Sequence, residues 1–283
     1  MRQIGRYRLD SVHGVGAFAT VWRGYDPEFD VEVAVKVLAD NWAHHADVRE
    51  RFLEEARLLR RIDDARVVRV HDVGVQDDRP YFVMDFVPGG TLADRVGHVS
   101  VEEAIAAAVA ACHAVQALHD HDVLHRDVKP SNLLVSAGGA VLVSDLGSAK
   151  RLAEASGITV TTGTPAYMAP EQAYGRPLDA RTDVYALGVL THELVTGRLP
   201  FDGPLGRTAN DRVAPAGAGP RVDAALAAAL AVRPEDRPAS AAALAELLES
   251  TEHAPRSFVS PWLVAPVMAL AFVVAAVTTW WLG

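Results

Sequence analysis

The chain has 283 residues, half of them hydrophobic, and its 27 Lys and Arg against 36 Asp and Glu leave a net charge of −9. This acidic balance excludes a general nucleic-acid-binding protein, because neutralising phosphates requires a cationic face, and the apolar content excludes a disordered chain. The single cysteine, Cys112, excludes an internal disulfide and a cysteine-rich metal site.

The first 85 residues predict a small β-rich unit with one helix. β-Branched and aromatic residues concentrate in five short runs, which is typical of strands. Between the third and fourth runs, Val48, Phe52 and Leu59 have the spacing of one helix face. We therefore expect strands at residues 7–12, 20–25, 31–38, 67–75 and 79–86, and a helix at 48–62.

A glycine-containing loop lies between the first two expected strands. Gly14 and Gly16 would let the backbone approach a polyphosphate closely. A plain β-turn explains two glycines equally well, and no helix follows, which excludes the dinucleotide-binding fingerprint. Taken alone, this loop is weak support for a nucleotide site.

Lysine is rare in this chain: it occurs at positions 36, 129 and 150, whereas 24 of the 27 basic residues are arginine. Lys36 lies on an apolar expected strand, where its charge is costly unless it meets a partner or an anion. Glu54 and Glu55 on the next helix are candidate partners. A lysine whose ammonium group reaches past the strand into water explains this segment equally well.

The chain from about residue 91 to about residue 250 predicts a mostly helical unit. It follows a Pro-Gly-Gly hinge at 88–90, and Ser100 is a suitable N-cap for an Ala-rich helix. We expect a strand at 140–143 and helices at 101–119, 183–196, 223–231 and 240–249.

The densest group of chemically useful residues is HRDVKPSN at 125–132, which holds an acid, two cations and an amide. Asp145 follows 18 residues after Asp127, and Ala-Pro-Glu follows at 169–171. With the glycine loop and the strand lysine, these motifs recur in the order of the eukaryotic-like (bacterial) serine/threonine protein kinase family, which the chain resembles from residue 6 to about 250. The lysine at 129 is that of the serine/threonine form.

This resemblance implies an α+β, two-lobed protein-kinase fold, with a β-rich N-lobe at 6–87 and a larger helical C-lobe at 88–251. It implies transfer of the γ-phosphate of ATP to serine and threonine hydroxyls of proteins, including the chain's own activation loop. Such transfer depends on positioning and on neutralising developing charge, which cations, carboxylates and one oriented acid supply. A homodimer that phosphorylates itself in trans is a further expectation.

The resemblance also assigns roles to single residues. Lys36 would hold the α- and β-phosphates and pair with Glu55, which lies at the family's spacing of 19 residues. Asp127 would accept the proton of the substrate hydroxyl, and Lys129 would steady the γ-phosphate. The residues implied to bind Mg²⁺ or Mn²⁺ are Asn132 and Asp145.

A nucleotide pocket is implied between the lobes, although ordinary core packing would also place apolar residues at several of its positions. Ala19 replaces the family's third glycine, and Leu146 replaces the usual phenylalanine after the metal-binding aspartate. The residues implied to contact adenine are Val21, Ala34, Met84, Asp85, Val87 and Leu134. The loop over the phosphates comprises His13, Gly14, Val15, Gly16, Ala17, Phe18, Ala19, Thr20 and Val21.

Further matches imply structural roles. Asp183 would brace the catalytic loop, which comprises residues 125–132. Glu171 would form a buried ion pair with Arg237. His125 is expected in the core, together with Leu59 and Leu146, rather than as a base or a metal ligand.

The segment between residues 145 and 171 predicts a switch. Arg126 directly precedes Asp127, and an arginine there can pair with a phosphate on this segment and order it. Thr164 matches a family threonine that contacts the catalytic loop. A polar loop without regulation is the alternative. The candidate phosphorylation sites are Thr159, Thr161 and Thr162.

Residues 262–282 predict a transmembrane helix. They are uncharged and would span about 31 Å as a helix, close to the thickness of a bilayer core of about 30 Å. Tryptophans lie at both ends, where aromatic belts belong, and a buried core helix is the alternative. Residues 1–10 lack the apolar run of a signal peptide. We therefore expect single-pass attachment to the cell membrane, a linker at 252–261 and a cytoplasmic kinase domain.

Two other functions stay open. A pseudokinase would keep the fold as a binding or scaffold module, but the chain retains every residue to which the family gives a catalytic role. A kinase-like phosphotransferase for a small molecule would generally lack the segment GTPAYMAPE at 163–171, which predicts a platform for a protein substrate.

Overall fold

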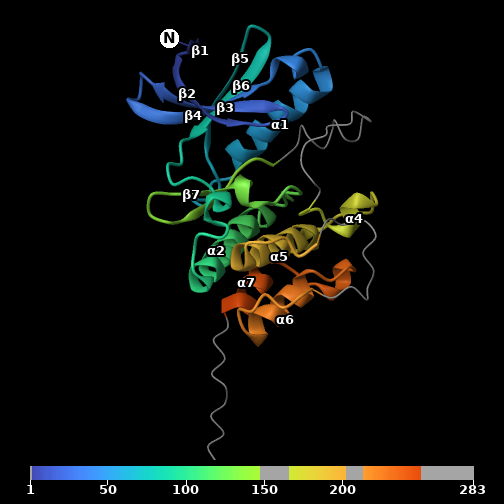
Figure 1. Cartoon of the computed structure of the whole chain (residues 1–283). Helices are drawn as coiled ribbons and strands as arrows, with labels where there is room; N and C mark the ends of the chain where they lie inside the picture. Colours follow the sequence, from blue (N-terminus) through green and yellow to red (C-terminus); the bar gives the residue numbers. More distant parts are fainter. Residues whose placement is uncertain (1, 147–165, 202–212, 250–283) are drawn as a thin grey trace, which may run out of the picture. The chain divides into compact units, whose positions relative to one another are not determined.

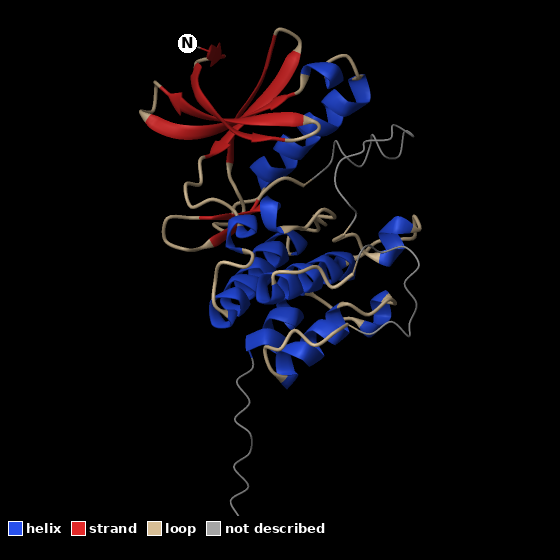
Figure 2. Cartoon of the chain, in the orientation of Figure 1, coloured by secondary structure: helices blue, strands red, loops and turns tan. Residues whose placement is uncertain are grey.

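The computed structural model describes residues 2–146, 166–201 and 213–249, and these form two lobes (Figure 1). One lobe is a sheet with a long helix beside it, and the other consists mainly of helices (Figure 2). The expected two-lobed α+β architecture is therefore confirmed. The expectations for Thr159, Thr161, Thr162 and Thr164 and for residues 250–283 lie outside the described residues.

The N-lobe is built on one antiparallel sheet with the strand order β1-β2-β3-β4-β6-β5. Helix α1 (Ala46–Arg61) packs against β5 and β6, where the Phe52 and Phe82 rings lie 5.0 Å apart. The strands are β1 (Arg2–Ile4), β2 (Tyr7–Val15), β3 (Ala19–Asp26), β4 (Val31–Leu38), β5 (Val70–Gln76) and β6 (Arg79–Asp85).

Alternation along β4 separates two apolar layers, because successive side chains of a strand point to opposite faces. Val33, Val35 and Val37 pack with Tyr7 and Tyr81 in one layer. The other layer contains Ala34 and Leu38 together with the buried side chains of α1. Lys36 alternates in step with Ala34 and Leu38, so its side chain lies on the face of the sheet that carries α1.

Strand β1 was not predicted, because three residues are too few to show an alternation. It pairs with β2, and Gln76 of β5 holds the turn between them. The Gly5 N–H donates to Gln76 Oε1 at 2.6 Å, and Gln76 Nε2 donates to the Gln3 carbonyl at 3.3 Å.

The strand predicted at 67–75 was wrong at its start. β5 begins at Val70, whereas residues 66–68 pair with a strand of the C-lobe. The Val68 N–H donates to the Val143 carbonyl at 3.0 Å, and the Val143 N–H donates to the Arg66 carbonyl at 2.8 Å. The apolar run is continuous across this point, so residue spacing does not reveal that it joins two different sheets.

The C-lobe packs around α2 (Val101–His119), which contacts α5, α7 and β8. Ser100 is the predicted N-cap: its hydroxyl accepts from the Glu103 N–H at 3.2 Å, and Glu103 accepts from the Ser100 N–H at 2.9 Å. The other elements are β7 (Leu133–Val135), β8 (Val141–Val143), α4 (Pro170–Ala173), α5 (Ala180–Thr196), α6 (Pro220–Ala229), α7 (Ala241–Glu249) and the short 3₁₀ turns η2 (Leu92–Arg95), η3 (Pro130–Asn132) and η4 (Pro234–Asp236).

Helix α2 is long and apolar enough to span a membrane by length and composition, and it is the one such helix among the described residues. Half of its most apolar stretch is buried inside the protein, which is typical of a core helix. The predicted span at 262–282 belongs to the part of the chain that is not described.

The hinge brings backbone segments of the two lobes into close contact at Gly89. A Cβ atom at this position would lie 2.3 Å from the Val135 carbonyl oxygen of β7, so only glycine fits. The Val135 N–H also donates to the Gly90 carbonyl at 2.9 Å. These contacts hold the end of the N-lobe next to the loops that carry the polar residues of the site.

Candidate active site

Lys36 lies at the centre of the first group of site residues. The strand register sets Lys36 opposite Val21 of β3 and opposite Phe82 of β6. Lys36 Nζ donates to Glu55 Oε1 at 2.7 Å, and it also forms an ion pair with Asp145. Burial alone would lower the pKa of Lys36, but the two carboxylates outweigh burial and the pKa is raised.

The neighbouring Glu54 points to a different partner. It forms a surface ion pair with Arg51 at 3.0 Å, while the side chain of Glu55 is only 3% exposed. Of the two candidate partners, Glu55 is therefore the one that meets Lys36.

Asp127 receives hydrogen bonds from two other residues of its loop. Lys129 Nζ donates to Asp127 Oδ2 at 3.0 Å. Asn132 Nδ2 donates to the Asp127 carbonyl at 2.8 Å and to Oδ2 at 3.2 Å. The Ser144 N–H donates to the Asn132 carbonyl at 3.0 Å, which ties this loop to the segment that carries Asp145. The arrangement fixes the Asp127 carboxylate beside a cation.

Asp183 braces this loop from α5. Its carboxylate accepts from the N–H groups of His125 and Arg126 at 2.9 and 2.7 Å, and from His119 Nε2 at 2.8 Å. Burial raises the pKa of Asp183, but the hydrogen bonds and nearby histidines outweigh it, so the net pKa is lowered. The carboxylate therefore stays ionised and holds the loop by its backbone.

His125 is fully buried and serves as a backbone brace. Its Nδ1 accepts from the Asp127 N–H at 3.3 Å, which leaves the ring proton on Nε2 to donate to the Ser144 carbonyl at 3.0 Å. Both ring nitrogens are thus engaged with backbone groups of the site.

Two residues of the catalytic loops have left-handed backbone angles, with φ of 64° at Arg126 and 56° at Asp145. Such conformations cost about 1–3 kcal/mol each and persist where the surroundings enforce them. Here Asp183 and Gln172 hold the backbone of Arg126: Gln172 Nε2 donates to the Arg126 carbonyl at 2.9 Å.

The residues expected around adenine lie on β3, β4, β6 and β7 and just after β6. The register sets Ala34 opposite Met84, and both are buried, as is Val87. Val21 and Leu134 are half-buried against the same core. Asp85 is half-buried too, and its carboxylate contacts His71 Nε2 at 2.6 Å.

The glycine loop has room for a ligand at Gly14. A Cβ atom there would meet no protein atom within 4 Å, and its φ is not left-handed, so the protein's own packing does not demand glycine. The space beside Gly14 is therefore open to solvent. His13, next to it, packs against Phe86 with ring centroids 5.3 Å apart.

Asn132 and Asp145 offer one amide oxygen and one carboxylate for a metal ion. Asn132 directs its Nδ2 at Asp127, so its amide oxygen is the group left for a metal. Within the described ranges no three His, Cys, Asp or Glu side chains form a metal cluster. Mg²⁺ commonly takes only one or two protein ligands and completes its shell with phosphates and water, so this pair fits Mg²⁺.

A family model described as "Protein kinase domain" matches residues 7–219. The chain belongs to the protein kinase family. Among curated relatives of this kinase, the serine/threonine-protein kinase PknB of Mycobacterium leprae is 36% identical over 257 residues, which are 84% of this chain and 41% of that protein. The probable serine/threonine-protein kinase PknB of Corynebacterium glutamicum is 41% identical over 209 residues, 70% of this chain and 32% of that protein. The chain thus spans less than half the length of these relatives.

Solved structures agree with this assignment. The kinase domain of PknI from Mycobacterium tuberculosis matches with a TM-score of 0.70 at 28% identity, over 87% of this chain and 96% of that chain. The apo form of PpkA-294 matches with a TM-score of 0.76 at 25% identity, over 88% and 98%. The expected protein-kinase fold is confirmed.

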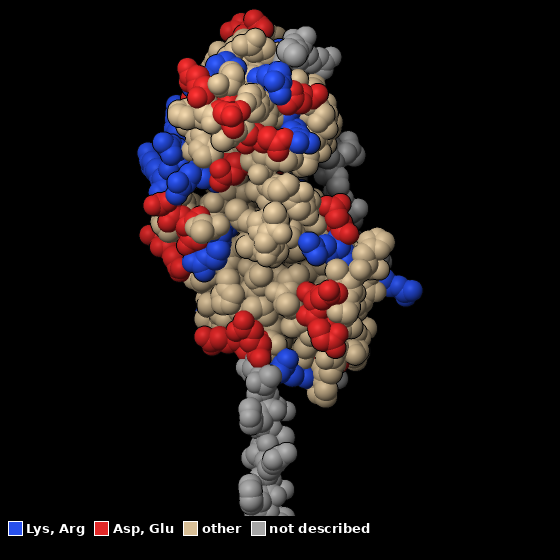
Figure 3. All heavy atoms as spheres, turned by 90° about the vertical axis from the view of Figure 1, so that its left-hand side faces the viewer, with Lys and Arg blue, Asp and Glu red and all other residues tan. Residues whose placement is uncertain are grey.

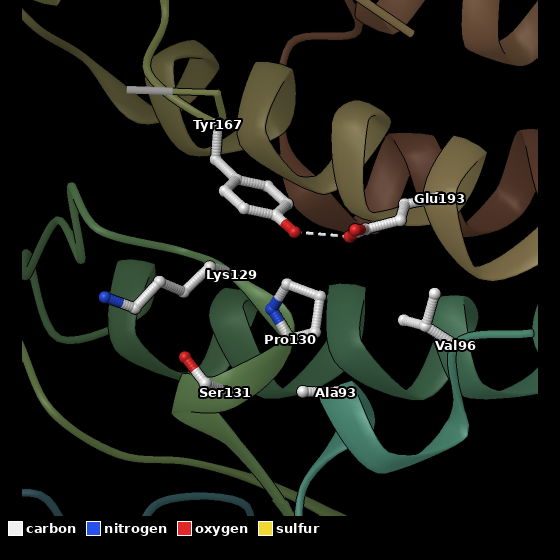
Figure 4. Close-up of a pocket in the computed structure, with 7 residues that line it drawn as sticks. All are labelled: Ala93, Val96, Lys129, Pro130, Ser131, Tyr167 and Glu193. Atoms are coloured by element: carbon white, nitrogen blue, oxygen red, sulfur yellow. Dashed lines mark hydrogen bonds between the residues drawn. The ribbon is translucent and has the colours of Figure 1, made fainter. Parts of the chain in front are cut away.

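A pocket of about 390 Å³ adjoins the catalytic loop of the kinase (Figure 4). Tyr167 and Glu193 face each other across one side of it, joined by a hydrogen bond, and burial together with Glu193 raises the pKa of Tyr167. Residue spacing does not predict this pair, because the two residues lie 26 positions apart and only the fold brings them together. The full lining is Ala93, Val96, Lys129, Pro130, Ser131, Tyr167 and Glu193.

Glu171 and Arg237 form a fully buried, bidentate ion pair. Arg237 Nη1 and Nη2 donate to the two Glu171 oxygens at 2.7 and 2.8 Å, and Thr182 donates to Glu171 Oε1 at 3.0 Å. Burial would raise the pKa of Glu171, but Arg237 outweighs it and lowers the pKa. Glu171 is the second residue of α4, whose Gln172 contacts the catalytic loop, so the pair anchors the helix that contacts that loop.

Proposed function

We propose that this kinase transfers the γ-phosphate of ATP to serine and threonine hydroxyls of proteins. The observation that carries the proposal is one constellation: Lys36 lies between Glu55 and Asp145, while Asp127 lies beside Lys129 and Asn132. The names of the relatives, serine/threonine-protein kinases, point the same way.

In this proposal each side chain does electrostatic or positioning work. Lys36 meets the α- and β-phosphates, and Glu55 holds it in place. Asp127 orients the substrate hydroxyl and accepts its proton, while Lys129 meets the charge that develops on the γ-phosphoryl oxygens. When bound at Asn132 and Asp145, Mg²⁺ or Mn²⁺ neutralises phosphate charge.

A protein is the substrate class that we favour over a small molecule. The segment GTPAYMAPE at 163–171, which kinase-like phosphotransferases for small molecules generally lack, supports this choice, and the pocket beside Lys129 and Ser131 would receive a residue next to the reacting hydroxyl. Retention of the whole constellation disfavours a pseudokinase scaffold.

We also propose regulation by phosphate on Thr159, Thr161 or Thr162. Arg126 supports this because it is exposed and its guanidinium has no ion-pair partner among the described residues. Attachment to the cell membrane through residues 262–282, a cytoplasmic catalytic domain and self-phosphorylation in a homodimer belong to the same proposal.

The test is to incubate the full-length chain with γ-labelled ATP, with Mg²⁺ or with EDTA, and to offer a generic protein and an aminoglycoside in separate reactions. We expect label on serine and threonine of the protein and of the kinase itself, and none with EDTA. Label on the aminoglycoside alone would point to the small-molecule class. Folded chain that binds ATP but transfers nothing would point to the scaffold.

A further inference from the structure

Trp42 connects the tip of the glycine loop to the segment that leads into α1. It lies in the 3₁₀ turn η1 (Asp40–Trp42), between β4 and α1, and is buried. Its indole N–H donates to the Ala17 carbonyl at 2.8 Å, and its ring stacks on Phe18 with centroids 4.8 Å apart. One side chain thus holds both residues at the tip of the loop.

The backbone reinforces this anchor. The Ala39 N–H donates to the Phe18 carbonyl at 2.9 Å, and the Gly16 N–H donates to the Ala19 carbonyl at 2.9 Å. The C=O and N–H of one trans peptide unit point in opposite directions. Because the Ala17 and Phe18 carbonyls point at the anchor, the N–H groups of Phe18 and Ala19 point away from it. Such backbone N–H groups are what a loop offers to phosphate oxygens.

The other side of Trp42 meets the start of α1. The His45 N–H donates to the Trp42 carbonyl at 3.0 Å, and the two rings lie 5.3 Å apart. His45 is the N-cap residue of α1, the helix that carries Glu55. The aromatic contacts therefore run from the glycine loop to the helix that holds Lys36 in place.

We propose that Trp42 is a positioning residue for the phosphates of the nucleotide. This inference rests on the proposed role of residues 13–21. Ordering a loop on binding costs conformational entropy, and a loop that is already ordered avoids that cost. Trp42 raises the affinity for the phosphate part of ATP without touching it, and leaves the affinity for adenosine unchanged.

Three variants of the full-length chain separate this role from simple packing. Trp42→Phe keeps a stacking ring and removes the indole N–H, whereas Trp42→Leu removes both. The matched control is Trp22→Phe, because Trp22 packs against the apolar layer on the opposite face of the sheet. For each variant the Kd of Mg–ATP and the Kd of adenosine are measured by calorimetry, after circular dichroism has shown that the protein is folded.

We expect Trp42→Phe to weaken ATP binding about fivefold, which corresponds to one neutral hydrogen bond of about 1 kcal/mol. Trp42→Leu is expected to weaken it on the order of 30-fold, since the stacking is lost as well. Adenosine affinity stays within about twofold for both, and Trp22→Phe changes neither affinity.

Two results would overturn the inference: unchanged ATP binding in Trp42→Leu, or equal losses for ATP and adenosine, which indicate packing alone. If Trp42→Leu does not fold, Trp42→Phe decides by the same comparison. Wild-type protein that binds ATP no more tightly than adenosine would instead remove the proposed phosphate role of the loop, and this inference with it.

Discussion

Lys36 keeps its charge in a buried position because two carboxylates face it. Its side chain is only 13% exposed, and an isolated ammonium group in such a place would lose its proton. Glu55 approaches from α1 and Asp145 from the loop after β8, so one cation joins two elements that are far apart in the chain. The position of Lys36 therefore depends on α1 as much as on β4.

Glu55→Gln is expected to lower kcat/KM about 10- to 100-fold, because it removes a charged hydrogen bond of about 1.5–3 kcal/mol to Lys36. Steady-state kinetics with a protein substrate checks this. The control is Glu54→Gln on the same helix, which loses only an exposed ion pair with Arg51 and should change kcat/KM by less than about twofold. Equal effects of the two substitutions would contradict the pairing.

At the site, the motifs predicted the charged residues, including Asp183, which accepts from two backbone N–H groups, but not the side chains that donate to backbone carbonyls. Glu55 was expected from its distance to Lys36, and Asp183 from its match to the family. Trp42 and Gln172 were not expected, since each acts on a carbonyl group of a distant segment. Every residue has a backbone carbonyl group. The sequence therefore contains no pattern that would identify which carbonyl accepts such a hydrogen bond.

At the scale of elements, short helices and turns depend on tertiary contacts rather than on propensity. Helix α4 has four residues, and the buried pair of Glu171 with Arg237 holds it against η4 and α5. The longer α5 begins three residues before its predicted start, because Asp179 caps it by accepting from the Arg181 N–H at 2.8 Å. It ends at Thr196 and is capped by Gly197, whose φ of 71° suits a glycine.

Glu171→Gln is expected to lower stability by about 3–5 kcal/mol, because it leaves Arg237 charged and buried without its ionic partner. For a domain of this size that corresponds to a fall in Tm on the order of 10 °C. Thermal unfolding followed by circular dichroism measures it. Asp236→Asn is the control, since it removes an exposed carboxylate from Arg233 and should cost at most about 1 kcal/mol. Equal shifts in Tm would contradict the buried role.

At the scale of the whole molecule, the motifs predicted the kinase fold, but they did not predict the backbone contacts that connect the two lobes. Residues 66–68 add to β8 rather than to the N-lobe sheet, and Gly89 lies against β7. Neither contact can be predicted from the spacing of residues in the sequence. Basic and acidic side chains are interspersed over both lobes on the face shown in Figure 3, in keeping with a net charge of −9.

Acid is expected to destabilise the described fold through Glu171 and Asp183. The pKa of each is lower in the folded protein than in the unfolded chain. As the pH falls below about 4.3, the unfolded chain therefore takes up these protons first. The stabilisation is complete above that pH and is lost as the pH falls through the folded pKa values. Tm measured from pH 7 to pH 3 should fall steeply below about pH 4.5; a Tm that stays level to pH 3 would be inconsistent with both pKa shifts.

Residues 262–282 are expected to keep the full-length chain in the membrane fraction after washing with carbonate or high salt, and to release it only with detergent. Leu270→Arg with Val274→Arg is the control, because each arginine near the centre of a span costs roughly 2.5–3.5 kcal/mol for insertion. That variant should shift to the soluble fraction. Release of the wild-type chain by carbonate alone would exclude the span.

The role of Asp127 as the catalytic acid–base group of a protein kinase is tested by the single substitution Asp127→Asn in the full-length chain. We expect kcat to fall by about 10² to 10⁴, the usual contribution of a positioned base, while the Kd of Mg–ATP stays within about twofold. Asp122→Asn, at an exposed position five residues earlier, should leave both quantities unchanged. Asp127→Asn protein that is folded, binds ATP and transfers phosphate at more than a few per cent of the wild-type rate would show that Asp127 is not the catalytic acid–base group.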